Sequence, residues 1–445
     1  MIYKLSTFAK VLGVEIPADK AGWGINILLT DSRDLVDPAR SMFFAIRTNG
    51  NDGHRYIGDL YERGVKVFVV RDVPADMADC QDVVFIRVQD VVAALQKVAA
   101  YHRSRFDTPV VAITGSAGKT IVKEWLYQLL HHRYTIVRSP RSFNSRIGVP
   151  LSVWGLTPQT TLGIFEAGIS KRGEMDALAR IIRPTVGVLT CITDEHDEGF
   201  DSRRQKCVEK VRLLKECRKV VYRADDPLVR DVVERMCAPE SLAGWSSVDK
   251  NAPLYISSVR REGASARVNY RCREGVGELC LPFTASVDIE NAIHCLAVCL
   301  TLDVPRDYVD ARMRMLAPVD TRLNVTEGVN DCMLVHDAYT TDYSSLGLAL
   351  DFMNRRRTSG RSHTVILSDP QHEDTNDPDV YSSCASLLRN KGVMRVIGVG
   401  PGMMKFRHFY GIDARFFEST DELLQKMSPG DFNHEFILMK GAPRF

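Results

Sequence analysis

Short apolar runs alternate with longer stretches of helical periodicity along most of the chain. The runs occupy residues 41–46, 65–70, 110–113, 162–166 and 186–190, and that at 110–113 is rich in β-branched residues. Runs of this length and composition predict buried strands. Between them, as at residues 54–63 and 120–130, apolar residues recur at the spacing of one helix face. Strands that alternate with helices favour an α/β fold with parallel sheets.

The pattern divides the chain into three units. Short elements fill residues 1–104, and the Phe-Asp-Thr-Pro stretch at 106–109 is typical of a linker. Residues 202–217 and 288–297 predict helices, and residues 255–281 predict antiparallel strands. From about residue 317, four strand runs (332–336, 364–368, 393–399, 436–439) alternate with three helices (344–355, 380–391, 420–427). We therefore expect domains at 1–104, 105–316 and 317–445, the last a doubly wound sheet.

Length and composition limit the class of protein. A chain of 445 residues is too long for one hydrophobic core. Its charged fraction of 26% and net charge of +2 lack the basic excess of a nucleic-acid-binding protein. No apolar run reaches membrane-spanning length and residues 1–10 lack the core of a signal peptide, so we expect a cytoplasmic enzyme. The 11 cysteines form no C-x-x-C pair, which argues against a zinc site or a disulfide framework, and Cys295 and Cys299 are expected in the core.

A glycine loop follows the strand at 110–113 and precedes the helix at 120–130. Residues 115–120 are Gly115, Ser116, Ala117, Gly118, Lys119 and Thr120. Such a loop presents backbone N–H groups to phosphate, with the lysine as a point charge and the threonine hydroxyl near Mg²⁺. Ile113 stands where the full P-loop pattern has glycine, so this is the shorter G-x-x-G-K-T form. The loop predicts a nucleotide site.

Two further polar residues come at or after strand ends in the same region. Glu166 ends the run at 162–166, and His196 follows the run at 186–190. Ligands collect beyond the carboxyl ends of parallel strands, so we expect both side chains near the glycine loop. A glutamate and a histidine at these two positions favour a shared site for metal and phosphate chemistry, rather than two unrelated surface side chains.

Several blocks together resemble the Mur ligase family, whose members form amide bonds with ATP in peptidoglycan precursor synthesis. The blocks are Gly-Ser-Ala-Gly-Lys-Thr-Ile-Val-Lys-Glu at 115–124, Phe-Asn-Ser-Arg-Ile-Gly-Val-Pro at 143–150, Glu-Ala-Gly-Ile-Ser-Lys-Arg-Gly-Glu at 166–174, His-Asp-Glu-Gly-Phe at 196–200 and Asp-Ala-Tyr-Thr-Thr-Asp-Tyr-Ser-Ser at 337–345. The resemblance covers the whole chain. It implies three domains: an N-terminal domain for the UDP-linked substrate, a central P-loop ATP-binding domain and a C-terminal Rossmann-like domain.

Within the family, the blocks resemble the branch that joins D-alanyl-D-alanine to UDP-N-acetylmuramoyl-tripeptide. Residues 368–374 also resemble a loop of the branch that adds a diamino acid to the dipeptide precursor, which is the alternative. Thr340, Thr341 and Tyr343 depart from the family pattern after Asp337, as do Asp288 and Ala442 elsewhere. These departures leave open whether the block at 337–345 binds nucleotide, and whether the chain is a non-catalytic nucleotide-gated binding protein.

The resemblance also implies roles for individual residues. Thr120 and Glu166 would hold one Mg²⁺, and Glu166, His196 and Lys210 a second, with Lys210 carbamylated unless Lys206 is the equivalent lysine. Asn291, Arg322 and Asp337 would contact the nucleotide. Ser32, Arg33 and Asn144 would contact the UDP-sugar peptide. The third residue of that peptide, lysine or a diamino diacid, and the oligomeric state stay open. Some relatives continue into an alanine racemase domain, which leaves open such a fusion beyond residue 445.

Overall fold

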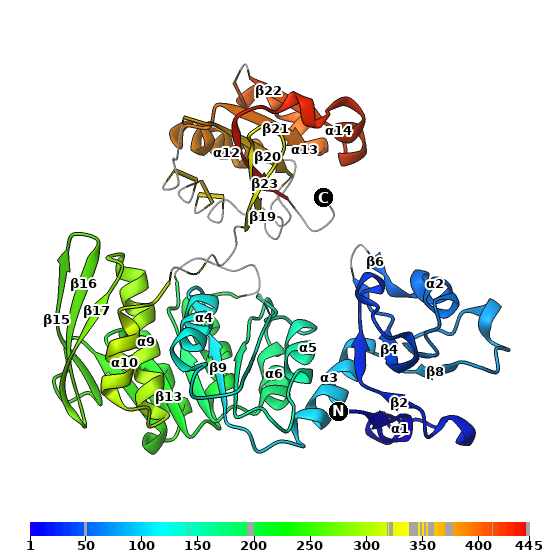
Figure 1. Cartoon of the computed structure of the whole chain (residues 1–445), viewed down its shortest axis with the longest axis horizontal. Coiled ribbons are helices and arrows are strands. Elements are labelled where there is room, and N and C mark those ends of the chain that lie inside the picture. The colour runs from blue at the N-terminus through cyan, green and yellow to red at the C-terminus, as the bar shows by residue number, and fades with distance from the viewer. Residues whose placement is uncertain are drawn as a thin grey trace. The chain divides into compact units, whose positions relative to one another are not determined.

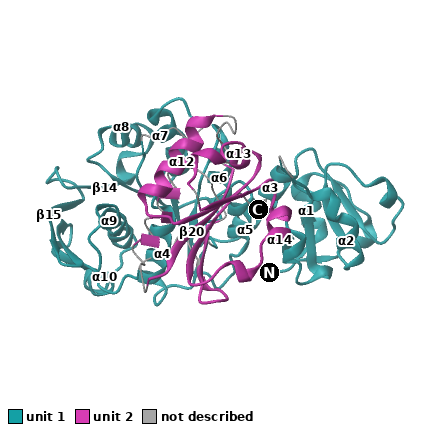
Figure 2. Cartoon of the chain, turned by 90° about the horizontal axis from the view of Figure 1, so that it is seen from above, with its two compact units in different colours: residues 1–319 teal, residues 320–445 magenta. Residues whose placement is uncertain are grey.

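The computed structural model describes most of the chain. It covers residues 1–48, 51–140, 142–193, 200–317, 319, 324–337, 346–347, 349–350, 353–354, 360–369, 377–411 and 413–441. The chain divides into two compact units, residues 1–319 and 320–445, which Figure 2 colours separately. The boundary lies close to the start of the third expected domain. The first unit contains the sheets of both the first and the second expected domains.

The N-terminal part of the first unit is built on a small parallel sheet (Figure 1). Its strands are β3 (Ile27–Leu29), β4 (Ser41–Phe44), β7 (Val67–Val70) and β8 (Val84–Arg87), in that spatial order. The helices α1 (Leu5–Leu12), α2 (Ile57–Glu62) and α3 (Val91–Arg103) accompany it. β4 and β7 are buried along their whole length, which explains their continuous apolar runs. The strands expected at 41–46 and 65–70 are therefore confirmed.

A nine-stranded sheet forms the rest of the first unit in the described part of the chain. In spatial order its strands are β10 (Ile136–Arg138), β11 (Leu162–Glu166), β9 (Val110–Thr114), β12 (Val186–Leu189), β13 (Lys219–Arg223), β14 (Leu242–Ser246), β15 (Leu254–Glu262), β16 (Ser265–Cys272) and β17 (Gly275–Leu281). The pairs from β10 to β15 are parallel, and β15, β16 and β17 pair antiparallel, as expected for residues 255–281.

The strand order changes direction at β9, which lies between β11 and β12 although both come later in the sequence. The chain runs from β9 to one side, to β10 and β11, and then crosses to the other side, to β12 and β13. Loops after the strands at such a switch point are where ligands bind in open parallel sheets. The glycine loop after β9 and Glu166 at the end of β11 both lie at this edge.

Helices cover both faces of this sheet. On one face, α4 (Lys119–Leu130), α9 (Ser286–Thr301) and α10 (Arg306–Met313) share a core that includes Trp125 and the predicted core residues Cys295 and Cys299. On the other face lie α5 (Gly148–Trp154), α6 (Glu174–Ile182), α7 (Arg203–Val211) and α8 (Pro227–Met236). The helix expected at 202–217 is shorter than predicted, because α7 passes into a 3-10 turn at Arg212–Leu214.

The second unit is a six-stranded sheet with helices on both faces. Its strands, in spatial order, are β18 (Asn324–Glu327), β19 (Met333–Asp337), β23 (Glu435–Lys440), β20 (Ser362–Ser368), β21 (Arg395–Val399) and β22 (Ala414–Phe417). All pairs except β18 with β19 are parallel. The core on one face includes α12 (Pro378–Asn390) and α13 (Pro401–Lys405), and that on the other includes Leu423 of α14 (Thr420–Lys426).

The expected doubly wound sheet is thus confirmed, although β18 and β22 were not predicted. Of the helix expected at 344–355, residues 346–347, 349–350 and 353–354 are described and are helical, and the others lie outside the described residues. Among the residues that are described, no helix combines the length and the apolar character needed to cross a bilayer.

Candidate active site

The glycine loop between β9 and α4 needs its two glycines. Gly115 has φ +146° and Gly118 has φ +83°, both in regions that disfavour side chains. A Cβ at Gly115 would overlap Thr190 Oγ1, and one at Gly118 would overlap the carboxamide of Asn291. The loop is tied to the end of β12, because Ser116 N donates to Cys191 O (2.8 Å) and Thr190 Oγ1 donates to Ala117 O (2.6 Å). The loop is therefore a fixed, tight cradle at the start of a helix.

Lys119 is the first residue of α4 and folds back over the loop. Its Nζ donates to the carbonyl oxygens of Gly115 (2.9 Å) and Ser116 (3.1 Å). The ammonium group thus stands at the mouth of the cradle, where the positive end of the helix dipole also favours an anion.

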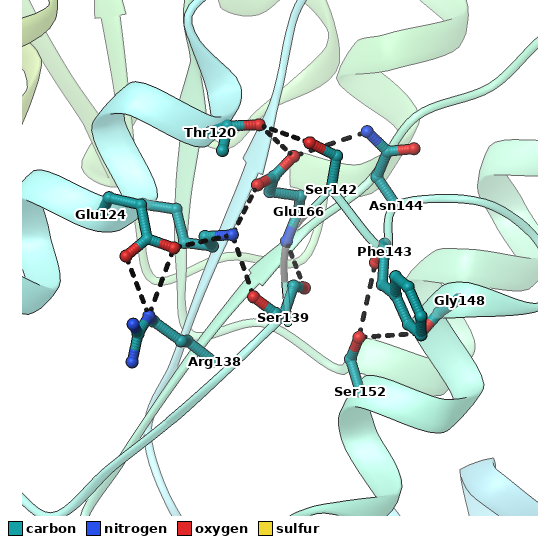
Figure 3. Close-up of polar contacts among 11 residues, drawn as sticks. Thr120, Glu124, Arg138, Ser139, Ser142, Phe143, Asn144, Gly148, Ser152 and Glu166 are labelled. Carbon is teal, nitrogen blue, oxygen red and sulfur yellow. Dashed lines mark hydrogen bonds and ion pairs between the residues drawn. The ribbon is translucent and has the colours of Figure 1, made fainter. Parts of the chain in front are cut away.

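Glu166 ends β11 as a fully buried carboxylate beside the helix start. Its Oε2 accepts hydrogen bonds from Thr120 Oγ1 (3.1 Å) and Asn144 Nδ2 (3.4 Å). Thr120 Oγ1 also lies 3.2 Å from Ser142 Oγ. The backbone is fixed as well, since Glu166 N donates to Ser139 Oγ at 3.1 Å (Figure 3). The structure therefore brings the predicted residues Thr120, Asn144 and Glu166 together.

Lys123 is a further member of this site, and its role was not predicted from the sequence. It lies one turn after Lys119 on α4, and its side chain is fully buried. Its Nζ lies 3.0 Å from Glu166 Oε1 and 3.1 Å from Glu124 Oε1, and it donates to Ser139 O at 2.9 Å. The sequence feature that could have identified Lys123 was its position on the helix that follows the phosphate loop, within the block at 115–124.

Asn291 on α9 lies against the phosphate loop. Its side chain is buried and contacts Gly118 closely. Within the described residues its Nδ2 has no hydrogen-bond partner. A buried amide donor without a partner beside a phosphate cradle is a position where a ligand acceptor would gain a hydrogen bond.

Both candidate lysines of α7 are buried. Lys206 is 1% exposed and Lys210 is 3% exposed, so neither is a surface lysine. Between them Glu209 accepts a hydrogen bond from Gly173 N (2.7 Å), which ties α7 to the start of α6. His196 lies outside the described residues. The described segment before it, up to Thr193, runs against the loop, since Thr193 N donates to Ser116 Oγ (3.2 Å).

The remaining candidates lie apart from this cluster in sequence. Ser32 and Arg33 lie in a short 3-10 turn. Arg33 is exposed and bonds Asp31 through Nε and Nη2, and this hydrogen bonding holds the pKa of Asp31 below its usual value. In the second unit, Asp337 at the end of β19 forms a buried ion pair with Lys440 Nζ (2.7 Å). Arg322 lies outside the described residues.

The donors present fit a magnesium nucleotide. Mg²⁺ takes oxygen ligands and is usually held by one or two carboxylates together with substrate phosphates. Thr120 Oγ1 and Glu166 Oε2 are such oxygens, adjacent to a cradle whose glycines leave no space for side chains. Among the described residues no cluster of three or more His, Cys, Asp or Glu side chains forms a metal site of the all-protein type.

Comparison with known proteins gives the family. Residues 113–299 match the model of the Mur ligase middle domain. The UDP-N-acetylmuramoyl-tripeptide--D-alanyl-D-alanine ligase of Bacillus subtilis is 24% identical over 430 residues, which are 94% of this chain and 90% of the relative.

Two solved structures share the fold over nearly the whole chain. MurF from Acinetobacter baumannii has a TM-score of 0.70 at 19% identity, covering 99% of this chain and 96% of that one. MurF from Thermotoga maritima in complex with ADP has a TM-score of 0.62 at 19% identity and covers 94% of each chain. Residues 113–299 therefore belong to the Mur ligase middle-domain family, and along nearly its whole length the chain is similar to ligases of that family.

Proposed function

We propose that this protein is the ATP-dependent ligase that joins D-alanyl-D-alanine to UDP-N-acetylmuramoyl-tripeptide in peptidoglycan precursor synthesis. One observation carries the proposal from the structure: the buried Glu166 carboxylate touches Thr120 at the start of the phosphate-loop helix. The names of relatives that align along nearly the whole chain support the substrates. Because the proposed substrate is a nucleotide-linked precursor, we also propose that the protein is cytoplasmic.

The chemistry follows from the difficulty of the reaction. A carboxylate does not condense with an amine in water, so the terminal carboxylate of the tripeptide is first phosphorylated by ATP. The P–O bond to ADP breaks as the acyl phosphate forms. The free amine of the dipeptide then attacks the acyl carbon, and inorganic phosphate leaves with the bond electrons. Catalysis of the first step consists mostly of positioning and of neutralising phosphate charge.

The residues of the central site divide these tasks. Backbone N–H groups of residues 115–120 would hold the phosphates, and Lys119 would move from the loop carbonyls to neutralise their charge. Thr120 and Glu166 would supply oxygen ligands for Mg²⁺, which when bound screens the charge of the transferred group. Asn144, already bonded to Glu166, would stand where the UDP-linked substrate meets this site.

Further assignments belong to the same proposal. His196 and Lys210, the latter as a carbamate, would complete a second magnesium site with Glu166. Asn291 in the first unit and Arg322 and Asp337 in the second would contact the nucleotide, and Ser32 and Arg33 the UDP moiety. The proposed domain limits are 1–104, 105–316 and 317–445. The buried, unpartnered amide of Asn291 supports its assignment most directly.

The test is phosphate release from ATP and Mg²⁺ in the presence of UDP-N-acetylmuramoyl-tripeptide, with and without D-alanyl-D-alanine. Release should require both substrates, and mass spectrometry should find the pentapeptide product. Lys119→Ala should lower the rate on the order of a thousandfold, as for loss of a principal charge-stabilising group, without changing the melting temperature. Release that depends instead on the dipeptide precursor and a diamino acid would support the diamino-acid-adding ligase. Nucleotide binding without turnover of any substrate would support a non-catalytic protein.

A further inference from the structure

Burying the ammonium group of Lys123 costs free energy, and phosphate binding alone does not explain why it is buried. Lysine is almost never fully buried unless it is paired. Its side chain has no exposed surface, and Lys119, one turn earlier, already supplies the cation at the cradle. We propose that Lys123 is a positioning residue, which turns the Glu166 carboxylate so that one chosen oxygen faces the magnesium site. This inference rests on the proposed function in taking Glu166 as a magnesium ligand.

The two oxygens of Glu166 have different surroundings. Oε1 points to the interior and lies 3.0 Å from Lys123 Nζ. Among the described residues, Oε2 accepts from two small polar groups instead, the hydroxyl of Thr120 (3.1 Å) and the amide of Asn144 (3.4 Å). A free carboxylate can rotate about its last bond, but an ion pair on one oxygen removes that freedom. The pair therefore reserves Oε2 for the side that holds the phosphate loop.

Lys123 is itself held by groups that leave it little choice of position. Its Nζ lies 3.1 Å from Glu124 Oε1 and donates to Ser139 O at 2.9 Å. Ser139 also binds the backbone of Glu166, because its Oγ accepts from Glu166 N at 3.1 Å. Ser139 and Lys123 thus fix the backbone and the carboxylate of the same residue. Partners of this kind orient a metal ligand from behind, and their loss typically weakens metal affinity about 10–100-fold.

Arg138 offers a matched control within the same network. Its Nε lies 3.1 Å from Glu124 Oε2, and its guanidinium stacks 3.6 Å from the Tyr127 ring (Figure 3 shows the pair with Glu124). Like Lys123 it is a cation paired with Glu124, yet no contact joins it to Glu166 among the described residues. Removing it changes the net charge of the cluster by the same amount without freeing the Glu166 carboxylate.

The experiment compares Lys123→Met with Arg138→Met in the full chain. Calorimetry would measure ADP affinity across a Mg²⁺ titration and also without metal. We expect the Mg²⁺ concentration for half-maximal ADP affinity to rise about 10–100-fold in Lys123→Met and to stay at the wild-type value in Arg138→Met. Affinity for metal-free ADP should be unchanged in both, which a general structural defect would not produce. If Lys123→Met does not fold, Lys123→Gln, which keeps a donor for Ser139 O, should show the same direction of change.

An unchanged Mg²⁺ requirement in folded Lys123→Met, or equal rises in both variants, would overturn the inference. So would ADP binding to the wild type that does not respond to Mg²⁺. Because these measurements need no peptide substrate, they stand apart from the ligase assay. A wild-type protein that fails to ligate but shows the expected Lys123 effect would refute the proposed function and leave this inference intact.

Discussion

The energetic effect of the contact between the phosphate loop and α9 can be measured by comparing alanine substitutions at Gly118 and Gly173. Both residues precede a helix in the left-handed region, with φ +83° and ψ −13° at Gly118 and φ +81° and ψ −4° at Gly173. They differ in what a methyl group would meet. At Gly118 it would overlap the buried carboxamide of Asn291, whereas at Gly173 nothing lies within 4 Å.

The expected losses of unfolding free energy follow from these environments. Left-handed backbone costs a residue with Cβ roughly 1–2 kcal/mol, and the lower entropy of the unfolded chain returns about 0.4–1 kcal/mol. Gly173→Ala should therefore lose about 1 kcal/mol. Gly118→Ala should lose a further 1–3 kcal/mol or so, because the methyl group overpacks a buried site. Nucleotide affinity should fall in Gly118→Ala alone.

Urea unfolding followed by tryptophan fluorescence suits this comparison, because all four tryptophans lie within residues 1–319. Asn291→Ala should rescue Gly118→Ala to the level of Gly173→Ala, since it removes the group with which the methyl would collide. Equal losses of unfolding free energy in Gly118→Ala and Gly173→Ala, or no rescue by Asn291→Ala, would mean that Asn291 does not pack against the loop at Gly118.

Two further predictions concern buried titratable groups. Burial lowers the pKa of His294 to about 3, so the unfolded chain binds a proton below about pH 6.5 that the folded chain refuses. The contribution of neutral His294 to the free energy of unfolding is complete above pH 6.5 and is lost towards pH 3, at up to about 1.4 kcal/mol per pH unit. The unfolding free energy of His294→Gln should therefore fall less steeply with acid than that of the wild type. On α7, Lys210→Ala should be nearly inactive and partly rescued by short-chain carboxylates, while Lys206→Ala keeps activity; the reverse result would assign the carbamate to Lys206.

The elements that depend on local patterns were predictable from the sequence. The runs at 110–113 and 162–166 were continuous because both strands are buried on two faces, and the glycine loop carried its own signal. The position of Glu166 at a strand end followed from the same patterns. Partners distant in sequence were not predictable in this way. Nothing in the sequence pattern pairs Asp337 with Lys440 or places Asn291 against Gly118, since these contacts depend on how separate strands and helices assemble.

The buried lysines of α7 show a second limit of prediction from sequence. Periodicity assigns apolar residues to the core and charged residues to solvent, and on α7 the apolar residues Cys207 and Val211 are indeed buried. It could not anticipate that Lys206, Glu209 and Lys210 are buried as well. Lys206 and Lys210 are four residues apart and share a helix face, so their spacing alone does not separate their roles.

Burial of ionisable groups on α7 is itself an argument for function. A helix that served only to cover the sheet would be more stable with apolar residues at these positions, because desolvating a charge costs several kcal/mol that pairing only partly returns. The same reasoning applies to Lys123 and Glu166 beside the phosphate loop. In the first unit, α4 and α7 carry such residues and follow β9 and β12 at the switch point of the sheet, while Lys20 and Arg103 are buried elsewhere. Most of the buried charges in the described part of the first unit therefore lie on elements that adjoin the switch point, where the proposed phosphate- and metal-dependent reaction would need fixed charges.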